Sequence, residues 1–196
     1  MPVVVEKYSA RSLESAVTVL ADAFVTNPIL VSAFGGQHLS YSRLFFRFGL
    51  RHMFKGDVFV ARVDGEVRGC MHFVSSPKCL PAAEEIPLAM ANLLKLIGDA
   101  KPQVIKWFAR WCRLDPDAPH LHLGPIGVSP EMQGKGLGTA LMDRYIERLN
   151  RDKLAGYLET DRPENVRFYE KFGFRVMREE QLIGVPTWYM WRAEPG

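Results

Sequence analysis

The chain has 196 residues and a formal net charge of +3, with 47% hydrophobic and 24% charged residues. This length predicts a single domain over residues 1–196, and the composition argues against a disordered chain. The net charge is too small to predict nucleic-acid binding. No apolar stretch reaches the roughly 18 residues that would span a membrane, so we expect neither a nucleic-acid nor a membrane partner.

The cysteines and the N-terminus point to a cytoplasmic protein. Cys70, Cys79 and Cys112 are too few for a disulfide framework, and none of them forms a C-x-x-C pair that would suggest a thiolate zinc site. The first residues contain no long apolar segment of the kind found in secretory signals. We therefore expect reduced, partly buried thiols.

The first half of the chain predicts a strand, two helices and a hairpin. Asp64-Gly65 supplies the positive φ angles of a tight turn between two apolar strands. In chain order we expect a strand over 3–8, a helix capped by Ser9 or Ser12, a break at Asn27-Pro28, a helix over 39–54, and hairpin strands over 57–63 and 66–74.

The second half predicts helices that alternate with strands. In chain order we expect a helix over 88–97, a helix that begins near Pro102, a strand over 120–128, a helix over 136–150, a strand over 154–160, a helix over 165–172 ended by Gly173, and strands over 174–182 and 187–192 around Gly184-Val185-Pro186. Hairpins combined with one strand–helix–strand crossover imply an α/β fold with a sheet of mixed direction.

A glycine-rich turn lies between the expected strand over 120–128 and the helix that follows. Gly134, Gly136 and Gly138 have no Cβ atoms, so an anion can approach the backbone at the helix N-terminus, where N–H groups lack partners. Lys135 adds a positive charge and Thr139 a hydroxyl donor. The turn matches neither a dinucleotide fingerprint nor a Walker loop. The alternative is that the glycines only make a tight turn.

The pattern Q-x-x-G-x-G, formed by Gln133, Gly136 and Gly138, resembles the pyrophosphate loop of the GNAT superfamily of N-acetyltransferases. Residues 158–174 support the resemblance, because Asn165 is followed by Phe-Tyr and then by Gly-Phe as in that superfamily. The resemblance is good over about 120–192. It implies a mixed, mostly antiparallel central sheet with helices on both faces, and acetyl-CoA as co-substrate without a metal.

Within the superfamily, L-E-T at 158–160, F-Y-E-K-F-G-F at 168–174 and P-T-W-Y-M at 186–190 resemble the puromycin N-acetyltransferase-like branch. This likeness does not identify the acceptor. Asn165 is expected to hydrogen-bond the cofactor, or alternatively to cap its helix. The resemblance implies these cofactor-binding residues: Ile126, Gly127, Val128, Gln133, Gly134, Lys135, Gly136, Leu137, Gly138, Thr139, Asn165 and Phe168. Gly124 and Gly127 are expected to admit the cofactor or the acceptor.

Tyr169 and His122 are the expected catalytic residues. Tyr169 lies four residues after Asn165 on one helix face and, by resemblance, donates a proton to the leaving thiolate; the alternative is aromatic packing. His122 stands where the superfamily often has a glutamate base, and an imidazole accepts a proton near neutral pH. The alternatives are a water relay with His120 or a merely polar strand residue. No further ligand lies nearby in sequence, so we expect no metal at His120 and His122.

The expected acceptor is the primary amine of a small molecule, bound by elements within about 20–117. The alternatives are a protein N-terminal or lysine acetyltransferase and a non-catalytic acyl-CoA sensor. An open groove would indicate a protein acetyltransferase. The segment 75–117 is long enough for a lid or a homodimer interface. Glu159 is either structural or a contact of the acceptor amine. The aromatic and polar candidates for the acceptor cleft are Phe24, Asn27, Phe34, Phe45, Trp107 and Trp111.

Overall fold

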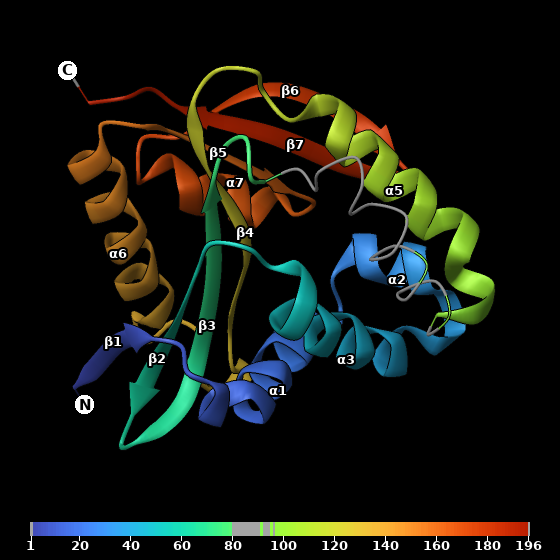
Figure 1. Cartoon of the computed structure of the whole chain (residues 1–196), viewed down its shortest axis with the longest axis horizontal. Helices are drawn as coiled ribbons and strands as arrows, with labels where there is room; N and C mark the ends of the chain where they lie inside the picture. The colour runs from blue at the N-terminus through green and yellow to red at the C-terminus, as the bar shows by residue number, and fades with distance from the viewer. Residues whose placement is uncertain (1, 80–90, 92–94, 96, 196) are drawn as a thin grey trace.

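The computed structural model describes residues 2–79, 91, 95 and 97–195. It contains one seven-stranded sheet in the order β1-β2-β3-β4-β5-β7-β6 (Figure 1). All neighbouring strands are antiparallel except β4 and β5. The strands are β1 Val3–Lys7, β2 Asp57–Val63, β3 Glu66–Ser75, β4 His120–Val128, β5 Ala155–Thr160, β6 Arg175–Leu182 and β7 Val185–Arg192.

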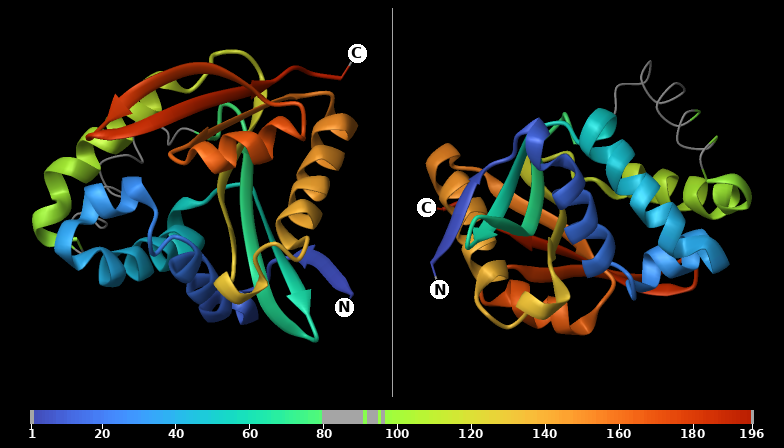
Figure 2. Two further views of the ribbon diagram at one scale, coloured as in Figure 1. Left: turned by 180° about the vertical axis from the view of Figure 1, so that it is seen from behind. Right: turned by 90° about the horizontal axis from the view of Figure 1, so that it is seen from below.

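Helices cover both faces of the sheet, as Figures 1 and 2 show. The α-helices are α1 Leu13–Ala23, α2 Pro28–Phe34, α3 His38–Phe48, α5 Lys101–Leu114, α6 Leu137–Asp152 and α7 Pro163–Glu170; α3 continues as a π-helix over Gly49–Met53. Short 3-10 helices span Ala10–Ser12, Gly35–Gln37, Gly98–Ala100 and Pro130–Met132. The mixed α/β fold predicted from the sequence is confirmed.

Alternating strand residues create two hydrophobic cores. On β3, Met71 and Phe73 point to the face covered by α6, whereas Cys70 points to the face covered by α1. Leu141 and Tyr145 of α6 are fully buried in the core on the α6 face. The core on the α1 face is richly aromatic and includes side chains that surround the cavity described below.

The parallel pair of β4 and β5 is short. It covers four residue pairs, from His120 with Ala155 to Leu123 with Leu158. β4 continues beyond Leu123 to Val128 alongside β3, but no pairing with β5 is recorded there for the described residues. The two strands therefore separate, and their facing edges carry backbone groups that a ligand can use.

Three local predictions are wrong. Neither Ser9 nor Ser12 makes a side-chain cap; the Ser12 hydroxyl instead accepts a hydrogen bond from Arg62 at 2.9 Å. The last turn is Ile183-Gly184, both with positive φ, and residues 185–186 belong to β7. The chain also resumes as α2 directly after the break at residues 27–28. The helix expected over 88–97 falls largely outside the described residues.

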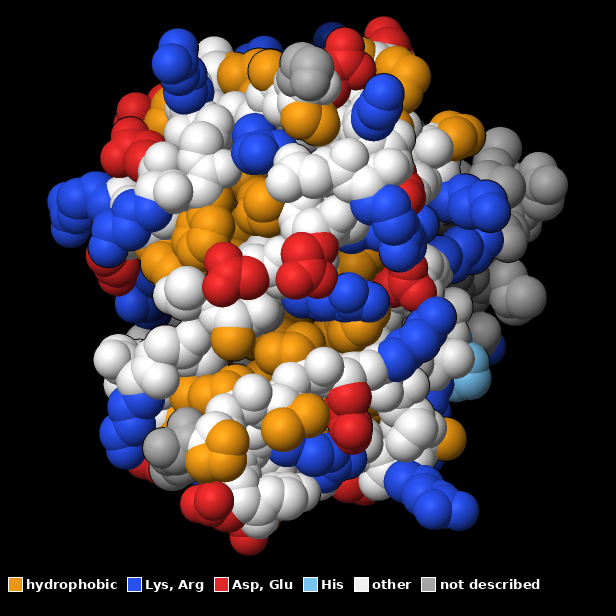
Figure 3. Space-filling model, turned by 90° about the vertical axis from the view of Figure 1, so that its left-hand side faces the viewer, with side chains coloured by type: hydrophobic (Ala, Val, Ile, Leu, Met, Phe, Trp, Pro, Cys, Tyr) orange, Lys and Arg blue, Asp and Glu red, His pale blue; other side chains and the backbone are white. Residues whose placement is uncertain are grey.

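Within the described part of the chain, no single helix is long and apolar enough to cross a membrane, although one bent pair, Ala10–Ala23 with Pro28–Met53, meets the length and composition requirements together. On the face shown in Figure 3, basic, acidic and hydrophobic side chains are interspersed. Neither sign of charge gathers into one large patch on that face.

Candidate active site

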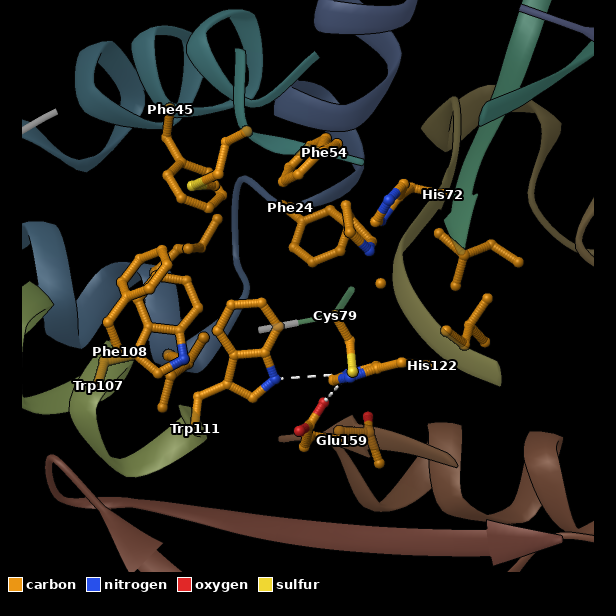
Figure 4. Close-up of a pocket in the computed structure, with 18 of the residues that line it drawn as sticks. Phe24, Phe45, Phe54, His72, Cys79, Trp107, Phe108, Trp111, His122 and Glu159 are labelled. Carbon is orange, nitrogen blue, oxygen red and sulfur yellow. Dashed lines mark hydrogen bonds and ion pairs between the residues drawn. The ribbon is translucent and has the colours of Figure 1, made fainter. Parts of the chain in front are cut away.

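A cavity of about 740 Å³ lies between the end of β4 and the N-terminal helices. This volume is within the range of small-molecule sites. Of the six residues expected in the acceptor cleft, five line the cavity; Phe34 instead belongs to the core, where it is 3% exposed. The aromatic wall is formed by Phe24, Phe45, Phe54, Trp107, Phe108 and Trp111 (Figure 4).

One end of this cavity is polar and carries His122 and Glu159 (Figure 4). Glu159 Oε2 lies 2.9 Å from His122 Nε2, and the Trp111 indole nitrogen lies 3.4 Å from the same ring atom. The second carboxylate oxygen, Glu159 Oε1, is buried and has no hydrogen-bond partner among the described residues. A buried acceptor without a partner is costly unless a ligand or water satisfies it.

Beyond His122 the polar end continues into a buried cluster. His122 Nδ1 lies 3.0 Å from Asp115 Oδ1, and His120 Nε2 lies 3.5 Å from the same oxygen. Cys79 Sγ lies 3.0 Å from Asp115 Oδ2 and 3.7 Å from His120 Nε2. The fold thus brings Cys79 and Asp115 beside the two histidines, although the sequence offered no further ligand near them.

Hydrogen bonds outweigh burial in setting the proton affinities of this cluster. Burial would lower the pKa of His120, but contacts with Asp115 and Cys79 raise that pKa to about 9. Burial likewise opposes the charge of His122, whereas the carboxylates of Glu159 and Asp115 raise its pKa. Burial would raise the pKa of Asp115, but the two histidines hold that pKa well below its usual range. Both ring nitrogens of His122 are therefore engaged with carboxylates.

Tyr169 and Asn165 of α7 line the same cavity. Tyr169 is 6% exposed, and burial raises the pKa of its phenol, so the hydroxyl keeps its proton at neutral pH. The Asn165 amide donates to the Thr160 hydroxyl at 3.2 Å. The alternative of Asn165 as a helix cap is wrong, because α7 begins at Pro163 with Arg162 as its N-cap.

Asn27 joins the N-terminal helices to the end of β5. Its side-chain oxygen accepts the Leu30 N–H at 3.0 Å and so caps α2, while its amide donates to Asp161 at 2.8 Å. The Asp161 carboxylate also accepts the Ile29 N–H at 2.7 Å. This junction fixes one wall of the cavity relative to the sheet.

The glycine-rich turn leads into α6 as expected. Gly134 and Gly136 have positive φ angles of 73° and 85°, and a Cβ at either position would meet nothing within 4 Å. The first helical N–H groups, those of Leu137, Gly138 and Thr139, have no recorded partner among the described residues. The turn therefore presents open backbone donors at the positive end of a helix dipole.

The residues around the turn differ in burial and in contacts. The Leu137 side chain is buried in the core, so this residue offers only its backbone. A Cβ on Gly138 would make an ordinary contact of 3.5 Å with Phe168 of α7. The Gln133 amide donates to the Val128 carbonyl at 3.4 Å, while Lys135 is exposed.

Two glycines of β4 leave room for neighbouring protein groups, and the expectation that they also admit the cofactor or the acceptor stays a prediction. A Cβ on Gly124 would lie 2.3 Å from Nδ1 of His72, and a Cβ on Gly127 would lie 2.9 Å from the Cβ of Ala23 on α1. Both positions therefore let protein groups approach the strand. Ile126 lines the cavity, and the backbone of Ile126, Gly127 and Val128 lies beyond the end of the β4–β5 pairing.

A parallel strand pair that separates beside an open helix N-terminus suits an extended ligand with an anionic end. Residues 27–174 match the model of the acetyltransferase (GNAT) family, and the chain belongs to this family. Members of the family use acetyl-CoA as co-substrate.

The chain is similar to several characterised proteins. It is 33% identical over 79 residues to mycothiol acetyltransferase of Beutenbergia cavernae. The aligned region covers 39% of this chain and 26% of that protein. The chain thus spans about a quarter of the length of this curated relative. The crystal structure of histone acetyltransferase HPA2 and related acetyltransferase from Corynebacterium glutamicum has a TM-score of 0.78 at 22% identity, covering 100% of this chain and 98% of that one. Drosophila melanogaster polyamine N-acetyltransferase has a TM-score of 0.62 at 16% identity, covering 97% and 98%.

Helix α5, which carries three of the aromatic residues of the cavity wall, is held to the sheet by an ion pair. Arg110 Nε donates to Glu180 Oε1 of β6 at 2.7 Å, and the Tyr189 hydroxyl donates to the same oxygen at 2.9 Å. The Arg110 guanidinium lowers the pKa of Glu180 to about 2. The Glu180 carboxylate therefore stabilises the position of α5 only while it is ionised.

We expect Glu180→Gln to lower the melting temperature near neutral pH, with a difference from the parent protein that shrinks in acid. The folded-state pKa lies below the unfolded value of about 4.3, so this stabilisation is complete above about pH 5 and is lost as the pH falls toward 2. Thermal unfolding followed by circular dichroism over this pH range measures it. Glu179→Gln, on an exposed residue of the same strand, is the control. A difference that stays constant with pH would contradict the ion-pair assignment.

Proposed function

We propose that the protein is an N-acetyltransferase that moves an acetyl group from acetyl-CoA to the primary amine of a small molecule with an aromatic or apolar body. The observation that carries this proposal is the buried, unpartnered Glu159 Oε1 at the polar end of an aromatic cavity. A cationic amine would satisfy that oxygen while its apolar body contacts the aromatic wall. Family membership supports the reaction class.

The residues around the turn fit acetyl-CoA. The open backbone at Gly134 and Gly136 and the free N–H groups that begin α6 suit a pyrophosphate, and Lys135 and Thr139 add a charge and a hydroxyl beside it. The β4 backbone over 126–128 suits the extended pantetheine arm, and Asn165 and Phe168 of α7 are the side chains that we assign to cofactor binding. When bound, acetyl-CoA supplies an activated acyl thioester.

We expect Gly136→Asp to abolish acetyl-CoA binding, because the substitution puts a carboxylate against the phosphates. Isothermal titration calorimetry measures the affinity. Gly65→Asp is a matched control: Gly65 also has a positive φ, of 82°, and open space around it, but it lies in the β2–β3 turn. The control has the same backbone strain and should retain binding. Unchanged affinity in Gly136→Asp would refute the assignment of the loop.

Glu159 is the residue we propose as the proton acceptor for the amine. Glu159 lines the cavity and its buried Oε1 has no hydrogen-bond partner among the described residues, whereas both nitrogens of His122 are already engaged with carboxylates. We therefore assign His122, which the sequence suggested as the base, the role of a positioning residue that holds Glu159 through Oε2. Glu159 Oε1 first accepts one proton from the bound ammonium, and the neutral amine then attacks the thioester carbonyl. As the C–S bond breaks, a proton of the Tyr169 phenol passes to sulfur, and the second proton of the nitrogen restores the phenol.

The test of this function is a panel of small primary amines, assayed by the release of free coenzyme A with a thiol reagent. We expect amines with an aromatic or long apolar body to react best. Glu159→Gln should then lower kcat/KM by roughly 10²-fold or more while leaving acetyl-CoA affinity intact. Glu170→Gln, on the exposed side of α7, is the control. Normal turnover in Glu159→Gln would remove Glu159 from the reaction.

Tyr169 is proposed as the acid that protonates the leaving sulfur. The phenol lines the cavity, and burial raises its pKa, so it carries a proton that it can donate.

We expect Tyr169→Phe to lower kcat by roughly 10²-fold with little change in acetyl-CoA affinity. Steady-state kinetics with the best amine, together with calorimetry, separates the two effects. Since Phe keeps the ring packing against Phe174, a loss of stability is not expected. An unchanged kcat would restrict Tyr169 to packing.

The aromatic lining of the cavity and its volume, which is in the range of small-molecule sites, support a small acceptor over a protein chain. Tyr169 argues against a sensor that only binds acyl-CoA, since such a protein needs no proton donor near the thioester. The likeness to the puromycin N-acetyltransferase-like branch is compatible with an acceptor that has an aromatic body. It does not specify which amine is the substrate.

A further inference from the structure

Four side chains meet beside the cavity in an arrangement that the proposed reaction does not explain. They are Cys79, Asp115, His120 and His122, and one potential ligand atom from each lies within 4.8 Å of the others. Cys79 follows β3, Asp115 follows α5, and the two histidines lie on β4. The fold, rather than a local motif, brings these four residues together.

The separations between these atoms are close to those of a tetrahedral zinc site. Zinc bonds of about 2.0–2.3 Å give distances of about 3.3–3.8 Å between neighbouring ligand atoms. Here Nε2 of His120 lies 3.7 Å from Cys79 Sγ and 3.5 Å from Asp115 Oδ1. Asp115 Oδ2 lies 3.0 Å from Cys79 Sγ, and Asp115 Oδ1 lies 3.0 Å from His122 Nδ1. All the ligand atoms lie within 4.8 Å of one another, so a central ion would draw them together.

The outward-facing nitrogens of both histidines are held as they are in metal sites. His120 Nδ1 lies 2.8 Å from the carbonyl oxygen of Ala118, and His122 Nε2 lies 2.9 Å from Glu159 Oε2. A metal-binding histidine generally donates its second N–H to a carbonyl or carboxylate, which fixes the tautomer. Once a metal displaces the protons on the inward nitrogens, His120 Nε2 and His122 Nδ1 would direct lone pairs into the cluster, with both N–H groups directed outward.

We propose that Cys79, Asp115, His120 and His122 form a closed structural site for a divalent zinc ion. One thiolate, one carboxylate and two imidazoles are a donor set that zinc accepts, and the two negative ligands balance its charge. Binding displaces the Cys79 thiol proton and one proton each from His120 and His122, so that both histidines bind as neutral imidazoles. The side chains of His120, His122 and Asp115 are only 0%, 2% and 4% exposed, so four protein ligands leave no open position for substrate.

Such a site would have two structural effects. It would join Cys79 to Asp115, which are 36 residues apart, and thereby fix the segment after β3 against the end of α5. It would also fix the His122 ring so that Nε2 donates to Glu159. The inference goes beyond the proposed function, since it concerns the stability and geometry of the cavity wall in the absence of any acyl donor or acceptor.

The test uses tag-free protein purified without chelators from zinc-supplemented cells, with metal measured by inductively coupled plasma mass spectrometry. We expect about one zinc ion per chain in the parent protein and in Cys112→Ser, and loss of most of it in Cys79→Ser. After chelation and dialysis, added Co²⁺ should give the visible bands of a tetrahedral site and a thiolate charge-transfer band that Cys79→Ser lacks. Returning Zn²⁺ to the parent apoprotein should raise its melting temperature.

The proposal is overturned if the full-length parent protein holds less than about a tenth of a zinc ion per chain and neither Co²⁺ spectra nor a Zn²⁺-dependent melting temperature can be obtained. It is also overturned if Cys112→Ser loses the metal as fully as Cys79→Ser, because Cys112 is not one of the four residues. If Cys79→Ser does not fold, the zinc content, the Co²⁺ spectrum and the melting temperature of the parent protein still test the proposal. None of them depends on turnover, so they are independent of the acetyltransferase assays.

Discussion

The early separation of β4 from β5 is the constraint on which the rest of the site depends. Pairing stops after four residue pairs, although both strands continue. On one side of the opening lies the glycine turn that begins α6, and on the other lies the aromatic cavity. An extended ligand can therefore pair with the free edge of β4 and reach both places. Without this separation, the sheet would be continuous and the anion-binding turn would have no connection to the cavity.

Close packing shapes β4 in the region where it separates from β5. At Gly127, α1 approaches the strand so closely that a Cβ would lie 2.9 Å from Ala23, and at Gly124 the His72 ring occupies the corresponding space. The pairing of β3 with β4 is irregular in the same region, between Met71 and Phe73. Gly124 and Gly127 therefore shape the strand from the side of the N-terminal helices, and this shape leaves its other edge free.

The sequence predicted the parts of the fold that depend on local periodicity. All seven strands were expected, most of them because a short apolar run is bounded by turn residues such as Asp64-Gly65. Helix α2 was missed because its seven residues are too few for a periodic pattern, and its cap, Asn27, was interpreted only as a break. The loop at 133–139 could be recognised because its glycines come directly before the start of a helix in the sequence.

The polar end of the cavity could not be predicted in the same way. His120 and His122 were identified as a pair on one strand, but Cys79 and Asp115 lie in connections whose positions depend on the whole fold. The argument against a metal considered only nearby residues and therefore lacked two of the four potential ligands. Glu159 was left with two equal interpretations, since only the three-dimensional structure shows that one oxygen contacts His122 while the other is unpartnered.

The same buried cluster connects the two proposals physically. A carboxylate that is to receive a proton from an ammonium must keep its negative charge in an aromatic environment, and an opposite charge nearby reduces the cost of burying it. His122 can supply that charge as an imidazolium, with Asp115 on its other nitrogen. A zinc ion on Nδ1 would supply it instead, and the only proton on the ring would then be the one that Nε2 donates to Glu159. In either state Glu159 Oε2 remains held by His122, and Oε1 remains the only one of its two oxygens available to the acceptor.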